Sequence, residues 1–221
     1  MSSSDHTNEK GEGEGLDRRR QPKQSRSVET FNSILEAAAA LFESRGYEPT
    51  TTHQIAGEAG VSVGALYRYF DDKEAILKEL YVREHSRMRE RILKGFTLTD
   101  LVTQDLKQLV RKAMVLAFSI FSERPALRRV LSEQSRKIPE LETIRRSQED
   151  EIHQAVRQIL TAAPGVAVPD KEIGAYLVTL FMDSLIDDYT LYRKEHSAFD
   201  QERIIAAASD FIQSYLLGRR D

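Results

Sequence analysis

Residues 46–77, GYEPTTTHQIAGEAGVSVGALYRYFDDKEAIL, decide the fold of this chain, because they contain two short helical patterns separated by a tight turn. In the first pattern, Ile55 and Ala59 lie one helical turn apart and face inward, whereas His53 faces the opposite way. Gly60 ends this helix, since glycine adopts the left-handed conformation without a Cβ penalty. The arrangement predicts a helix-turn-helix, a motif that places its second helix in the major groove of DNA.

The second short helix carries the residues best suited to read DNA. Its first turn can be capped by the hydroxyl of Ser62, and Leu66 and Phe70 are expected to be buried together one turn apart. The opposite face presents Gly64 and Arg68. Glycine lowers helix stability by up to about 1 kcal/mol relative to alanine, a cost that close approach of DNA would explain, with a simple glycine next to the turn as the alternative. The Arg68 guanidinium can donate two hydrogen bonds to guanine O6 and N7, and a phosphate contact is the alternative.

The stretch resembles the tetracycline-repressor-like (TetR/AcrR) family of transcriptional regulators. The matching residues keep a fixed order and spacing, and they are Gly46, Tyr47, Thr51, Thr52, Ile55, Ala56, Ala59, Gly60, Val61, Ser62, Leu66, Tyr67, Tyr69, Phe70, Lys73 and Glu74. This signature is confined to the N-terminal part of the chain. The remainder resembles the C-terminal domain of the family only in helix content and length.

The resemblance implies a DNA-contact surface made of residues from both short helices and the start of the next one. These residues are Thr52, His53, Ser62, Val63, Gly64, Ala65, Tyr67, Arg68, Tyr69 and Lys73. In the family, a lysine at the position of Lys73 binds the DNA backbone, and a phosphate would explain a cation in the first turn of a helix. Tyr67 and Tyr69 match positions that contact backbone or bases, with packing of one of them under the first helix as the alternative. His53 departs from the basic residue sometimes found at its position.

The composition is that of a folded, soluble protein. The chain has 221 residues and no cysteine, which excludes disulfides, thiolate metal sites and cysteine nucleophiles. No apolar run approaches the length of a membrane span, and the N-terminus lacks the apolar core of a signal peptide. We therefore expect a cytoplasmic protein without a membrane partner.

The formal net charge of −3 contrasts with the basic character of many DNA-binding proteins. Positive charge is nevertheless concentrated before the first helix. Residues 18–26 include no acidic residue and five basic ones, which are Arg18, Arg19, Arg20, Lys23 and Arg26. Such an arm can neutralise phosphates while acidic residues elsewhere keep the protein soluble. A solvated linker with accidental charge is the alternative.

The expected fold is all-α and has three parts. Residues 1–24 form a disordered polar and basic arm, residues 25–72 a three-helix helix-turn-helix DNA-binding domain, and residues 73–221 a helical effector-binding and dimerisation domain. Helical patterns and prolines predict helices at about 28–45, 71–94, 99–122, 125–136, 139–162, 170–193 and 199–218. Asp71 and Glu74 have the spacing of a capping box at the start of the second of these.

The last two helical patterns are apolar on more than one side. A helix on a monomer surface needs only one apolar stripe, so a second stripe implies burial against a partner. A homodimer held by a four-helix bundle explains both stripes, and the family resemblance implies the same. Central helices of a larger monomeric bundle are the alternative. The expected interface residues are Phe181, Leu185, Ala207, Phe211 and Tyr215.

The resemblance also implies a small-molecule effector in the C-terminal domain. The candidate lining residues are Phe96, Met114, Phe118, Phe121 and Tyr176. Met114, Phe118 and Phe121 share one helix face, although ordinary core explains the same stripe. Asp183, Asp187 and Asp188 form an acidic cluster on an otherwise apolar helix. One member is a candidate for a buried hydrogen-bonding group at the pocket or dimer interface, and solvation at the helix end is the alternative, above all for Asp187 and Asp188.

No catalytic, cofactor or metal motif stands out. The spacing of Glu149 and His153 could hold one edge of a metal site, but an exposed helix pair is the simpler explanation. The sequence therefore predicts a regulator that is not an enzyme and that binds a palindromic operator on double-stranded DNA as a homodimer. The resemblance implies a repressor that its effector releases from DNA. A ligand-independent architectural DNA-binding or protein-binding module with the same fold is the alternative.

Overall fold

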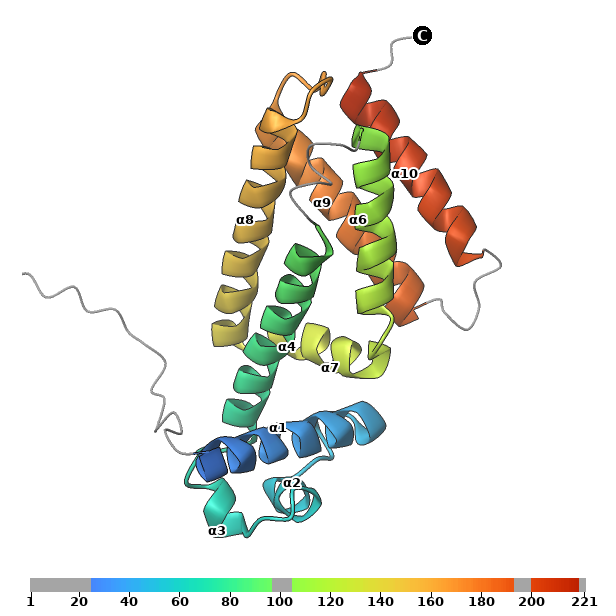
Figure 1. The fold of residues 1–221 in the computed structure, drawn as a ribbon. Helices are drawn as coiled ribbons and strands as arrows, with labels where there is room; N and C mark the ends of the chain where they lie inside the picture. The colour runs from blue at the N-terminus through green and yellow to red at the C-terminus, as the bar shows by residue number, and fades with distance from the viewer. Residues whose placement is uncertain (1–24, 97–104, 193–199, 219–221) are drawn as a thin grey trace, which may run out of the picture.

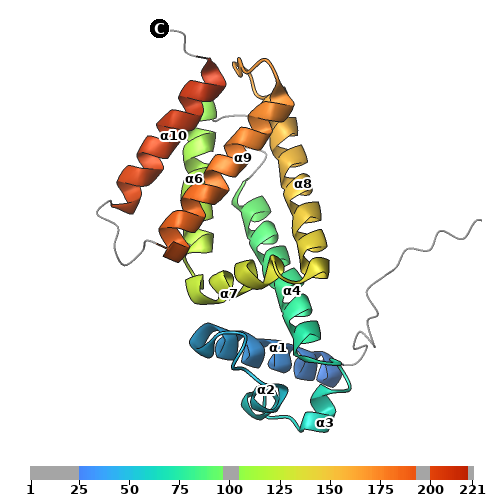
Figure 2. The same cartoon turned by 180° about the vertical axis from the view of Figure 1, so that it is seen from behind.

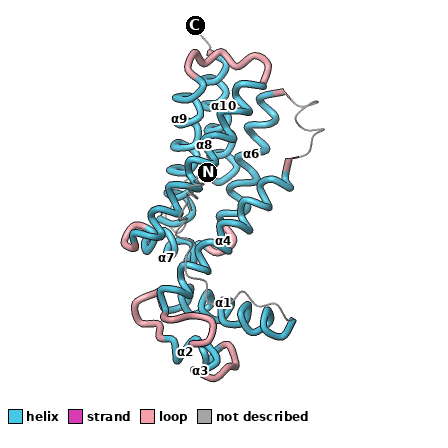
Figure 3. Tube along the Cα trace, turned by 90° about the vertical axis from the view of Figure 1, so that its left-hand side faces the viewer, coloured by secondary structure: helices cyan, strands magenta, loops and turns pink. Residues whose placement is uncertain are grey.

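The computed structural model describes residues 25–96, 105–192 and 200–218 of the chain. Throughout these ranges the regular elements are helices and none is a strand, which confirms the all-α fold (Figure 3). In chain order they are α1 (Ser25–Arg45), α2 (Thr52–Glu58), α3 (Val63–Leu66), α4 (Lys73–Gly95), α6 (Leu106–Phe121), α7 (Pro125–Ser135), α8 (Pro139–Ala162), α9 (Lys171–Asp187), the π-helix η1 (Asp188–Tyr192) and α10 (Gln201–Leu217). The expected arm at residues 1–24 lies outside the described residues.

The helices form two groups that α4 and α7 connect. Helices α1 to α3 make a small domain at one end of the molecule, and α6, α8, α9 and α10 form a bundle at the other end (Figures 1 and 2). α4 runs from the small domain into the bundle, and α7 lies crosswise between α1 and the bundle. One buried cluster joins Phe42 and Leu66 of the small domain to Leu127 of α7. A second cluster, which includes Met114 and Ile212, fills the bundle.

Glycines set the C-terminal ends of α1 and α2, whereas α1 begins at Ser25 and not at about residue 28 as expected, so that Arg26 belongs to this helix and not to the arm before it. Gly46 follows α1 with φ of 83°, and Gly60 follows α2 with φ of 68°. Both values lie in the left-handed region that favours glycine. The backbone N–H of Gly46 donates to the carbonyl of Phe42 at 2.9 Å, which satisfies one of the last carbonyls of α1.

The start of α4 differs from the expectation by one residue. Asp72, not Asp71, caps the helix, because Asp72 Oδ1 accepts a hydrogen bond from the backbone N–H of Ala75 at 2.7 Å. The predicted capping box between Asp71 and Glu74 is therefore wrong. Either aspartate could cap a helix through its carboxylate. The turn that follows α3 determines which of the two lies three residues before a backbone N–H group that has no partner within the helix.

In the C-terminal half the helix boundaries follow the prolines closely, with two differences. The helix expected from residue 99 begins at Leu106, where Asp105 Oδ1 accepts from the backbone N–H of Gln108 at 2.8 Å. The helix expected over 170–193 is α-helical only to Asp187 and then widens into the π-helix. None of the described helices is long and apolar enough to cross a membrane.

Candidate DNA-binding site

α2 is held at both ends of its first turn by a reciprocal cap. Thr51 Oγ1 accepts from the backbone N–H of Gln54 at 3.2 Å, and Gln54 Oε1 accepts from the backbone N–H of Thr51 at 2.9 Å. Ile55 is fully buried against α1, whereas His53 is exposed on the opposite face, as predicted. The cap and the buried Ile55 together fix which side of α2 faces outward.

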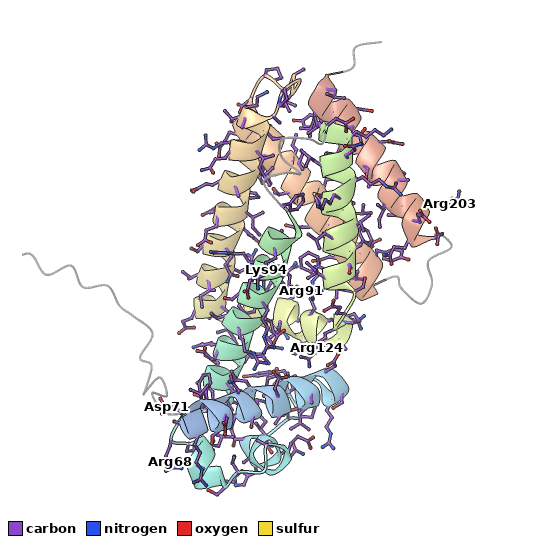
Figure 4. All side chains as sticks on the ribbon, viewed as in Figure 1. Arg68, Asp71, Arg91, Lys94, Arg124 and Arg203 are labelled. Atoms are coloured by element: carbon purple, nitrogen blue, oxygen red, sulfur yellow. The ribbon has the colours of Figure 1, made fainter. Side chains whose placement is uncertain are left out.

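α3 is a single helical turn that continues into a tighter turn. Ser62 Oγ accepts from the backbone N–H of Ala65 at 3.1 Å, so Ser62 caps this helix as predicted. Leu66 and Phe70 are both buried. Arg68 lies beyond the last residue of α3, where its backbone N–H donates to the carbonyl of Ala65 at 3.2 Å. Its side chain is exposed at the outer end of the small domain (Figure 4).

The two tyrosines beside Arg68 have different surroundings. The hydroxyl of Tyr67 lies 3.0 Å from Thr52 Oγ1, which ties α3 to α2 at the surface, and Tyr67 remains 46% exposed. The hydroxyl of Tyr69 instead lies 3.0 Å from Ser27 Oγ, and the Tyr69 ring meets Phe31 of α1 edge-on. Tyr69 is thus the tyrosine that packs under the first helix, and Tyr67 is the one that faces outward.

Lys73 has partners within the chain that the sequence did not reveal. Its ammonium donates to the carbonyl oxygens of Tyr47 at 2.8 Å and Glu48 at 3.2 Å. The same ammonium lies 4.1 Å from the centre of the Tyr47 ring, within the range of a cation–π contact. These contacts explain a cation in the first turn of α4 without a phosphate. The phosphate contact of Lys73 stays a prediction.

The remaining candidates lie on the same end of the molecule. Gly64 is exposed, and a Cβ atom built at this position would meet no atom of the chain within 4 Å. Ser62 is also exposed, while Thr52, Val63 and Ala65 are partly buried. The structure thus brings together the ten expected contact residues on α2, α3, the turn after α3 and the start of α4.

In the C-terminal domain the residues expected to line a pocket do not surround a common cavity. Met114 and Phe118 are fully buried in the core of the bundle, which agrees with the interpretation of this stripe as core. Phe121 packs under Arg128, whose Cζ lies 4.2 Å from the ring centre. Phe96 lies beside Lys112 at the end of α4. Tyr176 is 51% exposed on the outer side of α9, where it contacts the ring of His153.

A cluster of charged side chains lies where α4, α7, α8 and α9 meet. Arg128 pairs with Asp187 and donates to Thr190 Oγ1 at 2.8 Å. Burial and the nearby Asp187 raise the pKa of Asp183 to about 6, although Asp183 keeps access to solvent in the single chain. Burial and the charge of Arg128 lower the pKa of His85 to about 4. The sequence indicated only the aspartates of this cluster, because the other residues that form it come from separate helices.

The Glu149 and His153 pair gives no support for a metal site. Glu149 is engaged by Arg145, and His153 contacts Tyr176 instead. Over the ranges that the structure covers, no group of three or more histidines and carboxylates is placed to hold a metal ion.

The surface expected to form the dimer is apolar. Phe211 is 60% exposed and its ring centre lies 4.9 Å from that of Phe181, so α9 and α10 share one patch. Ala207 is exposed, whereas Phe181, Leu185 and Tyr215 are partly covered by their own chain. A further stripe of α9 is exposed, and it was not assigned to the interface from the sequence, where Tyr176 was expected to line the pocket instead: Ile173, Tyr176, Leu177 and Leu180.

Comparison with known families identifies both domains. The family described as "Bacterial regulatory proteins, tetR family" matches residues 34–80, and "Tetracyclin repressor-like, C-terminal domain" matches residues 105–216, half of the chain. The chain therefore belongs to the TetR family of transcriptional regulators.

Curated relatives match part of the chain. An uncharacterized HTH-type transcriptional regulator, YdgC of Bacillus subtilis, is 33% identical over 45% of this chain and 51% of its own length. The A-factor receptor protein of Streptomyces griseus is 45% identical over 26% of this chain and 21% of its own length. A probable acrEF/envCD operon repressor of Escherichia coli is 28% identical over 45% of this chain and 44% of its own length. The chain spans about half or less of the length of these relatives.

Solved structures share the fold over most of the chain. A transcriptional regulator from Rhodococcus sp. Rha1 aligns with a TM-score of 0.69 and 20% identity over 85% of this chain and 96% of its own. The fatty acid degradation regulator FadR from Bacillus halodurans aligns with a TM-score of 0.67 and 16% identity over 89% of this chain and 97% of its own. At these identities the similarity establishes the fold alone.

Proposed function

We propose that this protein is a homodimeric repressor that binds a palindromic operator and leaves it when a small molecule occupies the C-terminal domain. The observation that carries the DNA-binding part is the position of Arg68. Its guanidinium is exposed at the outer end of the helix-turn-helix, and within the described part of the chain it has no hydrogen bond or ion pair. Such an arginine is free to donate to guanine O6 and N7.

The exposed apolar faces of α9 and α10 support the dimer. Phe211 and Leu180 are 60% and 46% exposed in the single chain, and both belong to helices whose opposite faces fill the core of the bundle. A second copy that contributes the same two helices would bury these side chains in a four-helix bundle. Two-fold symmetry then presents two helix-turn-helix domains to the two halves of a palindrome.

Two relatives support repression and release by a ligand. One is named as a probable operon repressor, and another as a receptor protein for A-factor. The charged cluster around Arg128 and Asp183 gives the C-terminal domain polar groups that a small molecule could engage. A ligand-independent DNA-binding module is the second candidate, and the complete burial of Met114 and Phe118 within the core favours it.

Selection from random double-stranded DNA tests the proposal. Purified protein is expected to enrich duplexes that contain an inverted repeat, whereas Arg68→Ala should enrich the same repeat with relaxed preference at one position in each half. Enrichment of no sequence by the wild-type protein would overturn the proposed function. Addition of candidate small molecules to the enriched complex then separates the effector-released repressor from the ligand-independent module.

A further inference from the structure

α7 is placed to connect the helix-turn-helix domain with the bundle. It lies crosswise between α1 and the upright helices in both views (Figures 1 and 2). Leu127 and Leu131 on its apolar side are buried in the same cluster as Phe42 of α1. Its polar side carries Arg128 and Arg129, and Arg124 directly precedes it. These three residues are called the α7 arginines below.

At the end nearest α1, Arg124 binds the small domain. Its Nε and Nη2 atoms donate to Glu43 Oε2 at 3.1 and 2.9 Å. Both side chains are about one third exposed, so water screens this ion pair only in part. Figure 4 shows Arg124 directly above α1. Because α1 packs on α2, a shift of Arg124 that moves α1 would also move the helix-turn-helix.

About one helical turn further along α7, Arg128 and Arg129 hold the end of α9. Arg128 pairs with Asp187, donates to Thr190 Oγ1 at 2.8 Å and rests on the ring of Phe121. Its side chain is 19% exposed, so these contacts are well shielded from water. Arg129 donates to the carbonyl oxygen of Leu191.

The segment that these arginines hold is the π-helix at Asp188–Tyr192. Short π-helical segments continuous with an α-helix often occur at functional sites. A change from the π to the α register would rotate the following residues by roughly 100° for each residue of shift. Thr190 and Leu191, both buried, would then leave the positions in which Arg128 and Arg129 bind them. Arg128 and Arg129 therefore hold the π register seen in the structure, and a change to the α register would break their contacts with Thr190 and Leu191.

We propose that the α7 arginines couple the helical register at the end of α9 to the orientation of the DNA-binding domain. The coupling rests on the proposed function, because it regulates the same DNA-binding surface. A ligand or partner that changes the end of α9 would release Arg128 and Arg129, move α7 and, through Arg124 and Glu43, move α1. The contacts form one continuous chain from α9 to the helix-turn-helix, with no step through the α4 termini.

A double-mutant cycle on operator affinity tests this coupling. Asp187→Asn removes the charged partner of Arg128, and Thr190→Val is a milder change at the same end that keeps the side-chain volume. Each is expected to change the operator Kd by about fivefold. In an Arg124→Gln background the same changes should fall below about twofold, because the connection to α1 is already cut. Arg146→Gln, which breaks an exposed pair with Glu142 on α8, is the matched control and should be additive with Arg124→Gln.

Hydrogen exchange of residues 34–45 gives a second readout that needs no DNA. Exchange in α1 should be faster in Asp187→Asn than in the wild type, and no faster in the double variant than in Arg124→Gln alone. Additive effects on affinity, or α1 exchange that ignores Asp187→Asn and Thr190→Val in folded protein, would overturn the coupling while DNA binding stands. If the wild type bound no duplex, the proposed function would fail and the exchange measurement alone would judge the coupling.

Discussion

The ammonium of Lys73 lies 2.8 Å from the carbonyl oxygen of Tyr47 and 4.1 Å from the centre of the Tyr47 ring. This contact joins the first turn of α4 to the loop between α1 and α2. It fixes the helix-turn-helix on the helix that leads into the bundle, and it leaves Lys73 only partly exposed. Lys73 is therefore a structural residue of the DNA-binding domain as well as a candidate phosphate contact.

Lys73→Ala is expected to lower the free energy of unfolding by about 1–2 kcal/mol, because two charge-assisted hydrogen bonds and a cation–π contact are lost. It should also weaken binding to operator and random DNA alike, since a phosphate contact carries no sequence information. Urea denaturation and titration with both duplexes measure the two effects. Lys94→Ala, which breaks an exposed pair with Glu90 at the far end of α4, is the control. A less stable variant with unchanged DNA affinity would make Lys73 purely structural.

Gly64→Ala should stabilise the protein and weaken its complex with DNA. The new Cβ meets no atom of the chain, and alanine is favoured over glycine in a helix by up to about 1 kcal/mol. The same methyl group would occupy space that DNA is expected to approach. Gly57→Ala in α2, also without a neighbour within 4 Å, gives the matched gain in helix stability. Unchanged operator affinity in Gly64→Ala would show that DNA does not come close at this point.

Arg68→Ala is expected to cost about 1–3 kcal/mol of operator binding and to relax the preference at one base pair in each half-site. Stability should not change, since the side chain has no partner within the described chain. The exposed Arg45→Ala at the end of α1 controls for loss of positive charge in the same domain. If Arg68→Ala weakens all sequences equally, Arg68 binds phosphate and not a base.

Two groups should give the stability opposite dependences on pH. The folded pKa of His85 is about 4, below its ordinary value of 6.5, so only the unfolded chain takes up this proton as the pH falls from about 6.5 to about 4. Stability from neutral His85 is lost over that window, on the order of 3 kcal/mol at most. The pKa of Asp183 is raised to about 6, so its contribution grows as the pH falls from about 6 to its ordinary value of 3.8.

Unfolding free energies of His85→Gln and Asp183→Asn between pH 4 and 7 separate the two contributions. The curve of His85→Gln should fall less steeply toward acid than that of the wild type, and the curve of Asp183→Asn more steeply. Curves parallel to the wild type in both variants would contradict the assignment of these pKa shifts.

Local chemistry made much of the fold predictable. Gly46, Gly60, Thr51 and Ser62 act on their own neighbours in sequence, so their roles as helix ends and caps could be inferred before the structure was known. The choice between Asp71 and Asp72 could not, because it depends on how the turn after α3 is wound.

The contacts that escaped the sequence join distant residues. Arg124 and Glu43 are 81 residues apart, and Arg128 and Asp187 are 59 residues apart. Neither pair has a periodic signal, since each depends on the packing of α7 between the two domains. Tyr176 belonged to a helix that is apolar nearly all round, and only the packing of α9 on its own chain shows that this residue faces outward.

The central claim is that two chains, joined through α9 and α10, bind one palindrome. Phe211→Glu places a charge on the most exposed aromatic residue of that surface, so the single chain should still fold while the dimer separates. Val115→Glu is the control on α6, since Val115 has a similar exposure of 47% and lies outside the proposed interface.

The decisive measurement is sedimentation of wild type, Phe211→Glu and Val115→Glu with a duplex that carries the selected repeat or only half of it. We predict two chains on each full repeat for the wild type and Val115→Glu, with binding to the half repeat at least about tenfold weaker. Phe211→Glu should sediment as a folded monomer that binds neither duplex tightly. A wild-type complex of one chain per duplex, with equal affinity for full and half repeats, would contradict the account.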